Sequence, residues 1–88
     1  MEVKIFYTAD KFDSQPFVDS FEEDGVTVDN MIEIGSRIVR RVLGLNISGK
    51  VVTEVVLENT RKTVTIKKRL VPFASTETFA DAIEFLFK

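Results

Sequence analysis

The sequence contains no cysteine and no histidine. Without thiols, no disulfide can support the fold. The two side chains that most often bind transition metals are also missing, so Ser-His, Cys-His and zinc-dependent catalysis lack their parts. No pair of carboxylates stands out from the many acidic residues as a general acid and base. We therefore expect a protein that is not an enzyme and that uses neither a metal nor another cofactor.

Long hydrophobic runs are missing as well. The longest apolar segments span only a few residues, whereas a helix needs about 20 to cross a membrane. The sequence also begins without the basic segment and long apolar core of a signal peptide. These features predict a soluble, cytoplasmic protein with no membrane partner. The length of 88 residues predicts one domain, residues 1–88.

The net charge of −2 hides an uneven distribution of charge along the chain. Residues 1–36 hold nine acidic residues and two lysines, a net charge of −7. Residues 37–69 hold nine basic and two acidic residues, a net charge of +7, and residues 70–88 carry −2. Such asymmetry indicates an electrostatic partner. That partner is either another molecule or the protein itself, if the acidic segment folds onto the basic one.

Residues 51–70 predict a β-hairpin, because two β-branched runs flank the turn Glu58-Asn59-Thr60-Arg61. A loop of Asn59 and Thr60 gives these cross-strand pairs: Glu58 with Arg61, Val56 with Thr63, Glu54 with Thr65 and Val52 with Lys67. This face mixes charges with threonine, and the opposite face is mostly apolar near its middle. The pattern is typical of an antiparallel sheet with one wet side. A loop one residue longer would swap the two faces.

Residues 9–30 allow three interpretations. A short helix could begin at Asp13 or Ser14. Alternatively, a β-hairpin could turn at Asp24-Gly25 and return through residues 26–28. We favour the third, a loop or short strand with a turn at Asp24-Gly25. The acidic residues of this segment do not follow the spacing of a calcium-binding loop, so a solvated acidic loop is the better interpretation.

Residues 31–43 predict a helix that begins after Asn30 as its N-cap, has Glu33 in a capping box, and ends at Gly44. Its apolar half comprises Met31, Ile32, Ile34, Gly35, Ile38, Val39, Val42 and Leu43. Gly35 on this half predicts close approach to a strand. The polar half holds Glu33, Ser36, Arg37, Arg40 and Arg41. Three arginines against one acid leave guanidinium groups for the acidic loop, for a foreign carboxylate surface or for phosphate.

Residues 76–87 predict a second helix, capped by Ser75. Its buried arc is expected to contain Phe79, Ala80, Ala82, Ile83, Leu86 and Phe87. Phe85 lies outside this arc. Residues 3–8 add a strand that is apolar on both faces and therefore interior. The chain is thus predicted to form an α+β fold with a β-α-β-β-α core, in which a three- or four-stranded, mostly antiparallel sheet carries two helices on one face.

These features favour a small non-enzymatic protein-binding or assembly module, such as an adaptor, an inhibitor or a building block of a homo-oligomer. The expected partner is another protein or a second copy, steered by the charge asymmetry and contacted through exposed phenylalanine. The expected contact residues are Arg37, Arg40, Arg41, Lys67, Arg69, Phe85 and Phe87. The alternative is nucleic-acid binding, with phosphates held by the arginine face of the first helix and the basic second strand of the hairpin. Two features oppose it, because the basic region lacks aromatic residues for stacking and the domain is acidic overall.

Overall fold

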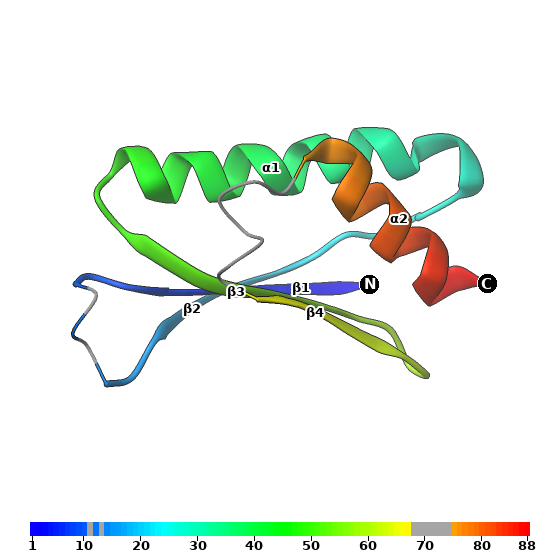
Figure 1. Cartoon of the computed structure of the whole chain (residues 1–88). Helices are drawn as coiled ribbons and strands as arrows, with labels where there is room; N and C mark the ends of the chain where they lie inside the picture. The colour runs from blue at the N-terminus through cyan, green and yellow to red at the C-terminus, as the bar shows by residue number, and fades with distance from the viewer. Residues whose placement is uncertain (11, 13, 68–74) are drawn as a thin grey trace.

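The computed structural model describes residues 1–10, 12, 14–67 and 75–88. It contains a four-stranded sheet in the order β2-β1-β3-β4, in which each neighbouring pair is antiparallel. The strands are β1 (Glu2–Thr8), β2 (Phe17–Glu22), β3 (Val51–Glu58) and β4 (Thr63–Lys67). Helices α1 (Met31–Ile47) and α2 (Thr76–Phe87) lie on the same side of this sheet (Figure 1). The predicted α+β fold with two helices on one face is confirmed, and β1 is an interior strand as expected.

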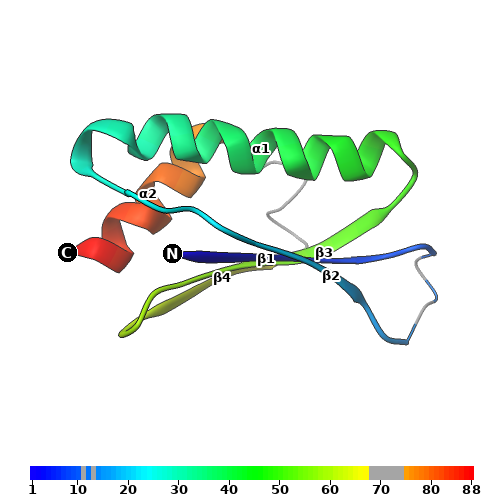
Figure 2. The same ribbon diagram turned by 180° about the vertical axis from the view of Figure 1, so that it is seen from behind.

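β2 lies within residues 9–30, the segment for which the sequence allowed three interpretations. It pairs with β1 from Glu2 opposite Glu22 to Tyr7 opposite Phe17 and forms one edge of the sheet (Figure 2). After it, Gly25 has a positive φ of 67°, which glycine adopts without strain. The favoured interpretation, a short strand with a turn at this glycine, is therefore confirmed. The alternative of a helix is wrong, because Phe17–Glu22 forms a strand. The alternative of a returning strand at residues 26–28 is wrong as well, because a short 3-10 helix, η1 (Val28–Asn30), follows the turn.

β3 and β4 form the expected hairpin with a different register. Residues 59–62 connect them, and the N–H of Asn59 donates to the carbonyl of Lys62 at 3.1 Å. The predicted pairs are therefore wrong, and the observed pairs are Glu58 with Thr63, Val56 with Thr65 and Glu54 with Lys67. Because the shift is two residues, the paired side chains keep their predicted faces.

The side chain of Asn59 stabilises this longer loop. Its Oδ1 accepts hydrogen bonds from the backbone N–H groups of Arg61 and Lys62, both at 2.9 Å. The predicted pair between Glu58 and Arg61 does not form, since the Glu58 carboxylate lies 2.8 Å from Nζ of Lys4 on the neighbouring strand. A side chain that satisfies two loop amides thus selects the four-residue connection over the two-residue turn.

An irregularity in β3 changes the face of Val52. Phe6 lies opposite Glu54, but the next residue, Tyr7, lies opposite Val52, so Thr53 is an extra residue in β3. Such a bulge reverses the alternation of side chains beyond it. Val52 is therefore buried, which corrects its predicted place on the polar face.

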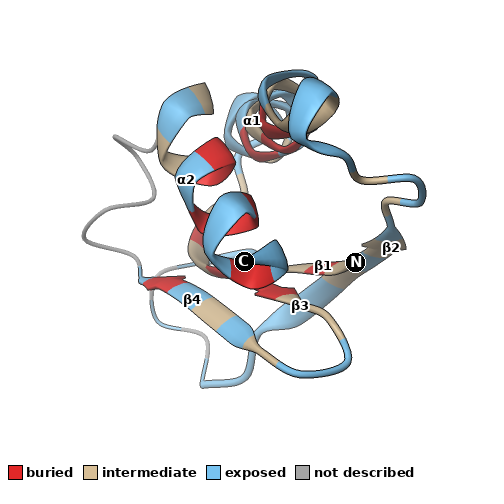
Figure 3. Ribbon diagram, turned by 90° about the vertical axis from the view of Figure 1, so that its right-hand side faces the viewer, coloured by how far each residue is buried: buried red, intermediate tan, exposed pale blue. Residues whose placement is uncertain are grey.

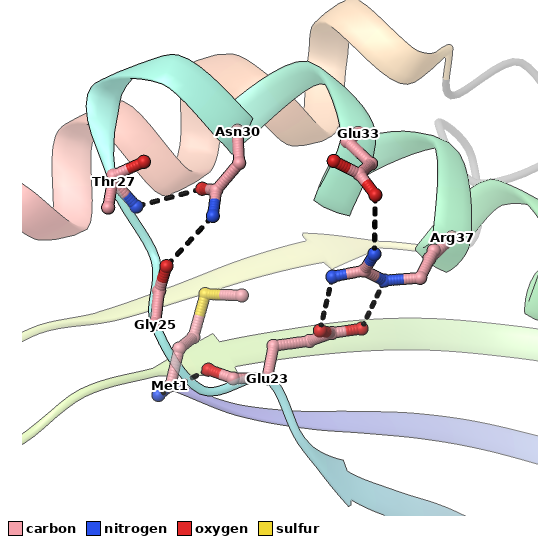
Figure 4. Close-up of polar contacts among 7 residues, drawn as sticks. All are labelled: Met1, Glu23, Gly25, Thr27, Asn30, Glu33 and Arg37. Carbon is pink, nitrogen blue, oxygen red and sulfur yellow. Dashed lines mark hydrogen bonds and ion pairs between the residues drawn. The ribbon is translucent and has the colours of Figure 1, made fainter.

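α1 is one turn longer than predicted, because Gly44 lies within it. The helix ends instead before Gly49, whose φ is 88°, and the N–H of Lys50 donates to the carbonyl of Leu45 at 2.9 Å. A glycine in the left-handed conformation ends the helix in the way expected one turn earlier. Asn30 makes no side-chain cap to α1. Its Oδ1 accepts from the N–H of Thr27, and its Nδ2 donates to the carbonyl of Gly25, both at 2.8 Å (Figure 4).

Gly35 brings the two helices together. A Cβ at this position would lie 2.7 Å from the carbonyl oxygen of Thr76 and 3.4 Å from the backbone nitrogen of Ala80. The predicted close approach is thus to the first turns of α2 and not to a strand. α2 itself begins as expected, since the N–H of Thr78 donates to Oγ of Ser75 at 3.2 Å.

The core lies between the helices and the sheet. It contains apolar residues of β1, β3, β4 and both helices, with Phe79 the largest fully buried side chain. Three residues predicted on the buried faces are exposed instead: Ile32 and Leu43 of α1 and Phe87 of α2. Ile32 and Leu43 lie at the margin of the apolar half of α1, about a quarter turn or more from its buried residues Ile34, Ile38 and Val42.

Candidate functional site

The arginine face of α1 is neutralised mainly by the segment that contains β2. Arg37 donates from Nε and from a terminal nitrogen to the two carboxylate oxygens of Glu23, at 3.2 and 2.9 Å (Figure 4). Its other terminal nitrogen lies 3.1 Å from Glu33, the expected i,i+4 pair. The hydrogen bond with Glu23 is the main reason that the pKa of Arg37 is raised above its ordinary value.

Arg41 makes the second contact with this segment. Its guanidinium donates to Asp19 at 3.3 Å and lies 4.2 Å from the centre of the Phe21 ring. Alternate residues of β2 face the helices, so Asp19, Phe21 and the following Glu23 all point towards α1. The acidic segment therefore folds onto the basic one at these two arginines, which is one of the two predicted outcomes.

Arg40 differs from its two neighbours. Its Nε lies 3.4 Å from the carbonyl of Ser36, and its guanidinium meets no carboxylate among the residues that the structure describes. A shallow hollow of about 490 Å³ lies beside it, lined by Arg37, Arg40, Arg41 and Gly44. Glu23 and Glu33 pair with Arg37 and Asp19 pairs with Arg41, so Arg40 is the arginine of this hollow without a carboxylate partner among the described residues.

The structure separates the basic residues that the sequence grouped. Lys67 lies on the uncovered face of the sheet, with its Nζ 3.0 Å from the Glu54 carboxylate, so it does not face the arginines of α1. Arg69 lies outside the described residues. Lys62 donates to the carbonyls of Phe85 and Lys88 at the end of α2, at 3.0 and 3.4 Å. Among the described residues, the arginine face of α1 and the basic side chains of the hairpin therefore do not form one continuous surface.

Phe85 is exposed as predicted, but it already has a neighbour in the fold. It is 53% exposed, and Nζ of Lys62 lies 4.8 Å from the centre of its ring. One face of the ring is thus engaged by a cation of the β3–β4 hairpin. This contact leaves less of the ring for an external partner.

Phe87 belongs to an apolar groove that the sequence did not reveal. The groove has a volume of about 440 Å³ and lies between η1 with the first turn of α1 and the last two turns of α2. Val28 is 84% exposed, Ile32 58% and Phe87 45%. Asp81, Glu84 and Lys88 form its charged margin. Figure 3 shows this end of the molecule, with exposed residues on the side of α1 that faces away from the sheet.

The same side of α1 carries two more exposed apolar residues, Leu43 at 51% and Ile47 at 86%. We call these five residues the outer helical surface: Val28, Ile32, Leu43, Ile47 and Phe87. Sequence reasoning missed Ile47 because the helix was predicted to end at Gly44. Its position four residues after Leu43 becomes informative only when the helix continues past that glycine.

Another hollow, of about 580 Å³, lies at one end of the sheet. It is open to solvent, and it is lined by three glutamates together with Met1, Asn59, Thr60 and Phe87. Lys4 lies 3.3 Å from Glu2 and 2.8 Å from Glu58, and the amine of Met1 lies 3.6 Å from Glu22. Each carboxylate thus has a cationic partner, and the described residues contain no group of three or more side chains suited to a metal.

No protein-family model matches this chain, and no characterised protein and no solved structure matches it either. In the part of the chain that the structure describes, neither helix has the length and apolar character needed to cross a membrane.

Proposed function

We propose that this protein is a non-enzymatic binding or assembly module that docks another protein chain through its outer helical surface. The observation that carries the proposal is the exposure of five apolar side chains, from 45 to 86%, along one side of the helical layer. Exposed apolar side chains gathered on one surface mark protein interfaces. Here Asp81 and Glu84 line the groove beside Phe87, and Arg40 lies on α1 between Ile32 and Leu43.

Burial of these side chains supplies the binding energy in this proposal. A fully buried valine, leucine, isoleucine or phenylalanine contributes about 1.5–3 kcal/mol relative to its exposed state. Burial of the five partly exposed side chains can therefore supply the free energy of association. Charge then sets specificity more than affinity.

The structure supports some of the contact residues proposed from the sequence better than others. Arg40 lies between the apolar residues of the outer helical surface and Phe87 lines its groove, and both remain proposed contacts. Arg37 and Arg41 are engaged by Glu23 and Asp19, and we propose no direct partner contact for them.

A photo-crosslinking experiment tests the proposal. A photoreactive amino acid replaces Ile47, and a matched control replaces Thr65, which is exposed on the uncovered face of the sheet. We expect a crosslinked protein species in cells from position 47 and a much weaker one from position 65. Equal yields at both positions, or no crosslink from position 47, would contradict docking through the outer helical surface. Fractionation of the same cells checks the cytoplasmic location, which stays a prediction.

Phosphate binding is the second candidate, favoured by the hollow that Arg40 shares with Arg37 and Arg41. Two of its three guanidinium groups are already paired, so we expect only weak binding of nucleic acid, with affinity that falls steeply as salt increases. Fluorescence anisotropy with a duplex at low salt measures it, and Arg40→Glu is the test variant. Binding that Arg40→Glu leaves unchanged would remove this candidate.

A further inference from the structure

We propose that the partner is a second copy of this chain, packed antiparallel to the first along α1 in a symmetric dimer. This inference rests on the proposed function and specifies which partner the outer helical surface takes. Two features of the structure support it, namely the spacing of the residues along α1 and the opposite charges at the two ends of the helix.

The outward side of α1 carries one continuous stripe. Positions 32, 36, 40, 43 and 47 recur at intervals of four, four, three and four residues, which places them on one face of a helix. Ile32 and Ile47 are the exposed apolar ends of the stripe, about 22 Å apart at 1.5 Å per residue. Ser36, Arg40 and Leu43 lie between them. The stripe thus runs nearly the full length of the helix.

The two ends of this stripe have opposite charge. Near the start of α1, Asp81 and Glu84 line the apolar groove together with Lys88, whose Nζ lies 3.7 Å from Glu84, so the acids outnumber the base there. At the other end, no acidic residue occurs from Ile34 to Thr53. Arg40 and Lys50 are the bases of that half without a carboxylate partner among the described residues.

An antiparallel arrangement joins these complementary ends twice. Leu43 and Ile47 of one copy meet Val28, Ile32 and Phe87 of the other, and the symmetry repeats this contact. Lys50 of one copy then lies near Asp81 and Glu84 of its partner, and the two helix dipoles oppose each other. Arg40 comes near the symmetry axis opposite Arg40 of the partner, and its bond to the Ser36 carbonyl draws the guanidinium along its own helix.

Sedimentation velocity of the purified protein, from about 1 to about 300 µM, tests for the dimer. We expect a concentration-dependent shift from monomer to dimer. Ile47→Asp should raise the dissociation constant at least about 100-fold, because the symmetric interface loses the contact twice. Val18→Asp is the matched control, since Val18 is 47% exposed on the far face of the sheet, and it should leave the constant unchanged.

Charge reversal tests the antiparallel arrangement itself. The double variant Asp81→Lys/Glu84→Lys and the single variant Lys50→Glu should each sediment as a monomer where the natural chain is dimeric. When the two variants are mixed, every reversed end meets a complementary one, and a heterodimer should form. Circular dichroism of each variant shows that it is folded.

Three results would overturn this inference. They are a monomer at all concentrations, equal effects of Ile47→Asp and Val18→Asp, and a mixture of the charge variants that stays monomeric. A monomer that still crosslinks from position 47 to a different protein would overturn self-association while leaving the proposed docking function intact. Loss of both the dimer and the crosslink would reject the proposed function as well.

Discussion

Replacing Gly35 by alanine should destabilise the protein although alanine favours helices. In an exposed helix interior, a change from glycine to alanine raises the free energy of unfolding by roughly 0.5–1 kcal/mol. At Gly35, however, the new Cβ would meet the carbonyl oxygen of Thr76 at 2.7 Å, a distance that packed atoms do not tolerate. The obstacle is backbone, so the two helices must separate. Overpacking of this kind costs about 1–3 kcal/mol, which leaves a net loss of up to roughly 2.5 kcal/mol.

Gly44 is the matched control in the same helix. A Cβ there has no atom within 4 Å, so Gly44→Ala should raise the free energy of unfolding by roughly 0.5–1 kcal/mol. Urea unfolding followed by circular dichroism measures both variants, and their midpoints should move in opposite directions. If Gly35→Ala were as stable as Gly44→Ala, the close contact between α1 and α2 would be refuted.

Three further perturbations test the polar contacts by unfolding measurements. Arg37→Glu and Glu23→Arg should each destabilise the protein, and the double variant should recover stability, whereas additive losses would contradict internal pairing. Asn59→Ala leaves two loop amides without their acceptor and should cost roughly 1–3 kcal/mol, so an unchanged urea midpoint would count against the four-residue loop. Hydrogen bonding to Glu58 raises the pKa of Lys4 in the folded protein above 10.5. The pair therefore contributes its full stabilisation below pH 10.5, and this contribution is lost as the pH rises through the pKa of Lys4 in the folded protein. Lys4→Met should therefore flatten the decline in stability at high pH, and an identical decline in both proteins would disprove the contribution.

The internal pairing of charges narrows the ways in which this protein can recognise a partner. Arg37 and Arg41 hold β2 and the segment after it against α1, so removal of either arginine acts on the fold before it acts on binding. Arg40 lies on the same helix within the outward stripe, without a carboxylate partner among the described residues. Substitution of Arg40 should therefore test binding more directly than substitution of Arg37 or Arg41, which also changes stability.

Local signals in the sequence identified much of the fold. Ser75 marked the start of α2, because a serine before a helix satisfies a free backbone N–H regardless of the rest of the protein. The alternation of residues 51–67 identified a hairpin and the correct faces for most of its side chains. Val52 escaped this reasoning, since the bulge at Thr53 is set by pairing with β1, a strand far away in sequence.

The candidate site was less accessible to sequence reasoning. The arginines of α1 were visible, but their partners Asp19 and Glu23 became apparent only when β2 was placed beside the helix. Val28 and Phe87 are far apart in the chain, and the groove between them exists only because α2 packs against the start of α1. Ile47 depended on the true end of α1, where Gly49 and not Gly44 adopts the left-handed conformation.

By itself, then, the sequence determined the types of the main elements, the absence of imidazole and thiol chemistry and the separation of opposite charges along the chain. These properties depend on neighbouring residues or on composition alone. Only the tertiary structure decided which charges neutralise each other and which apolar side chains stay outside the core. Both depend on the packing of segments distant in sequence, because an ion pair or a buried contact needs two surfaces and the local pattern describes only one.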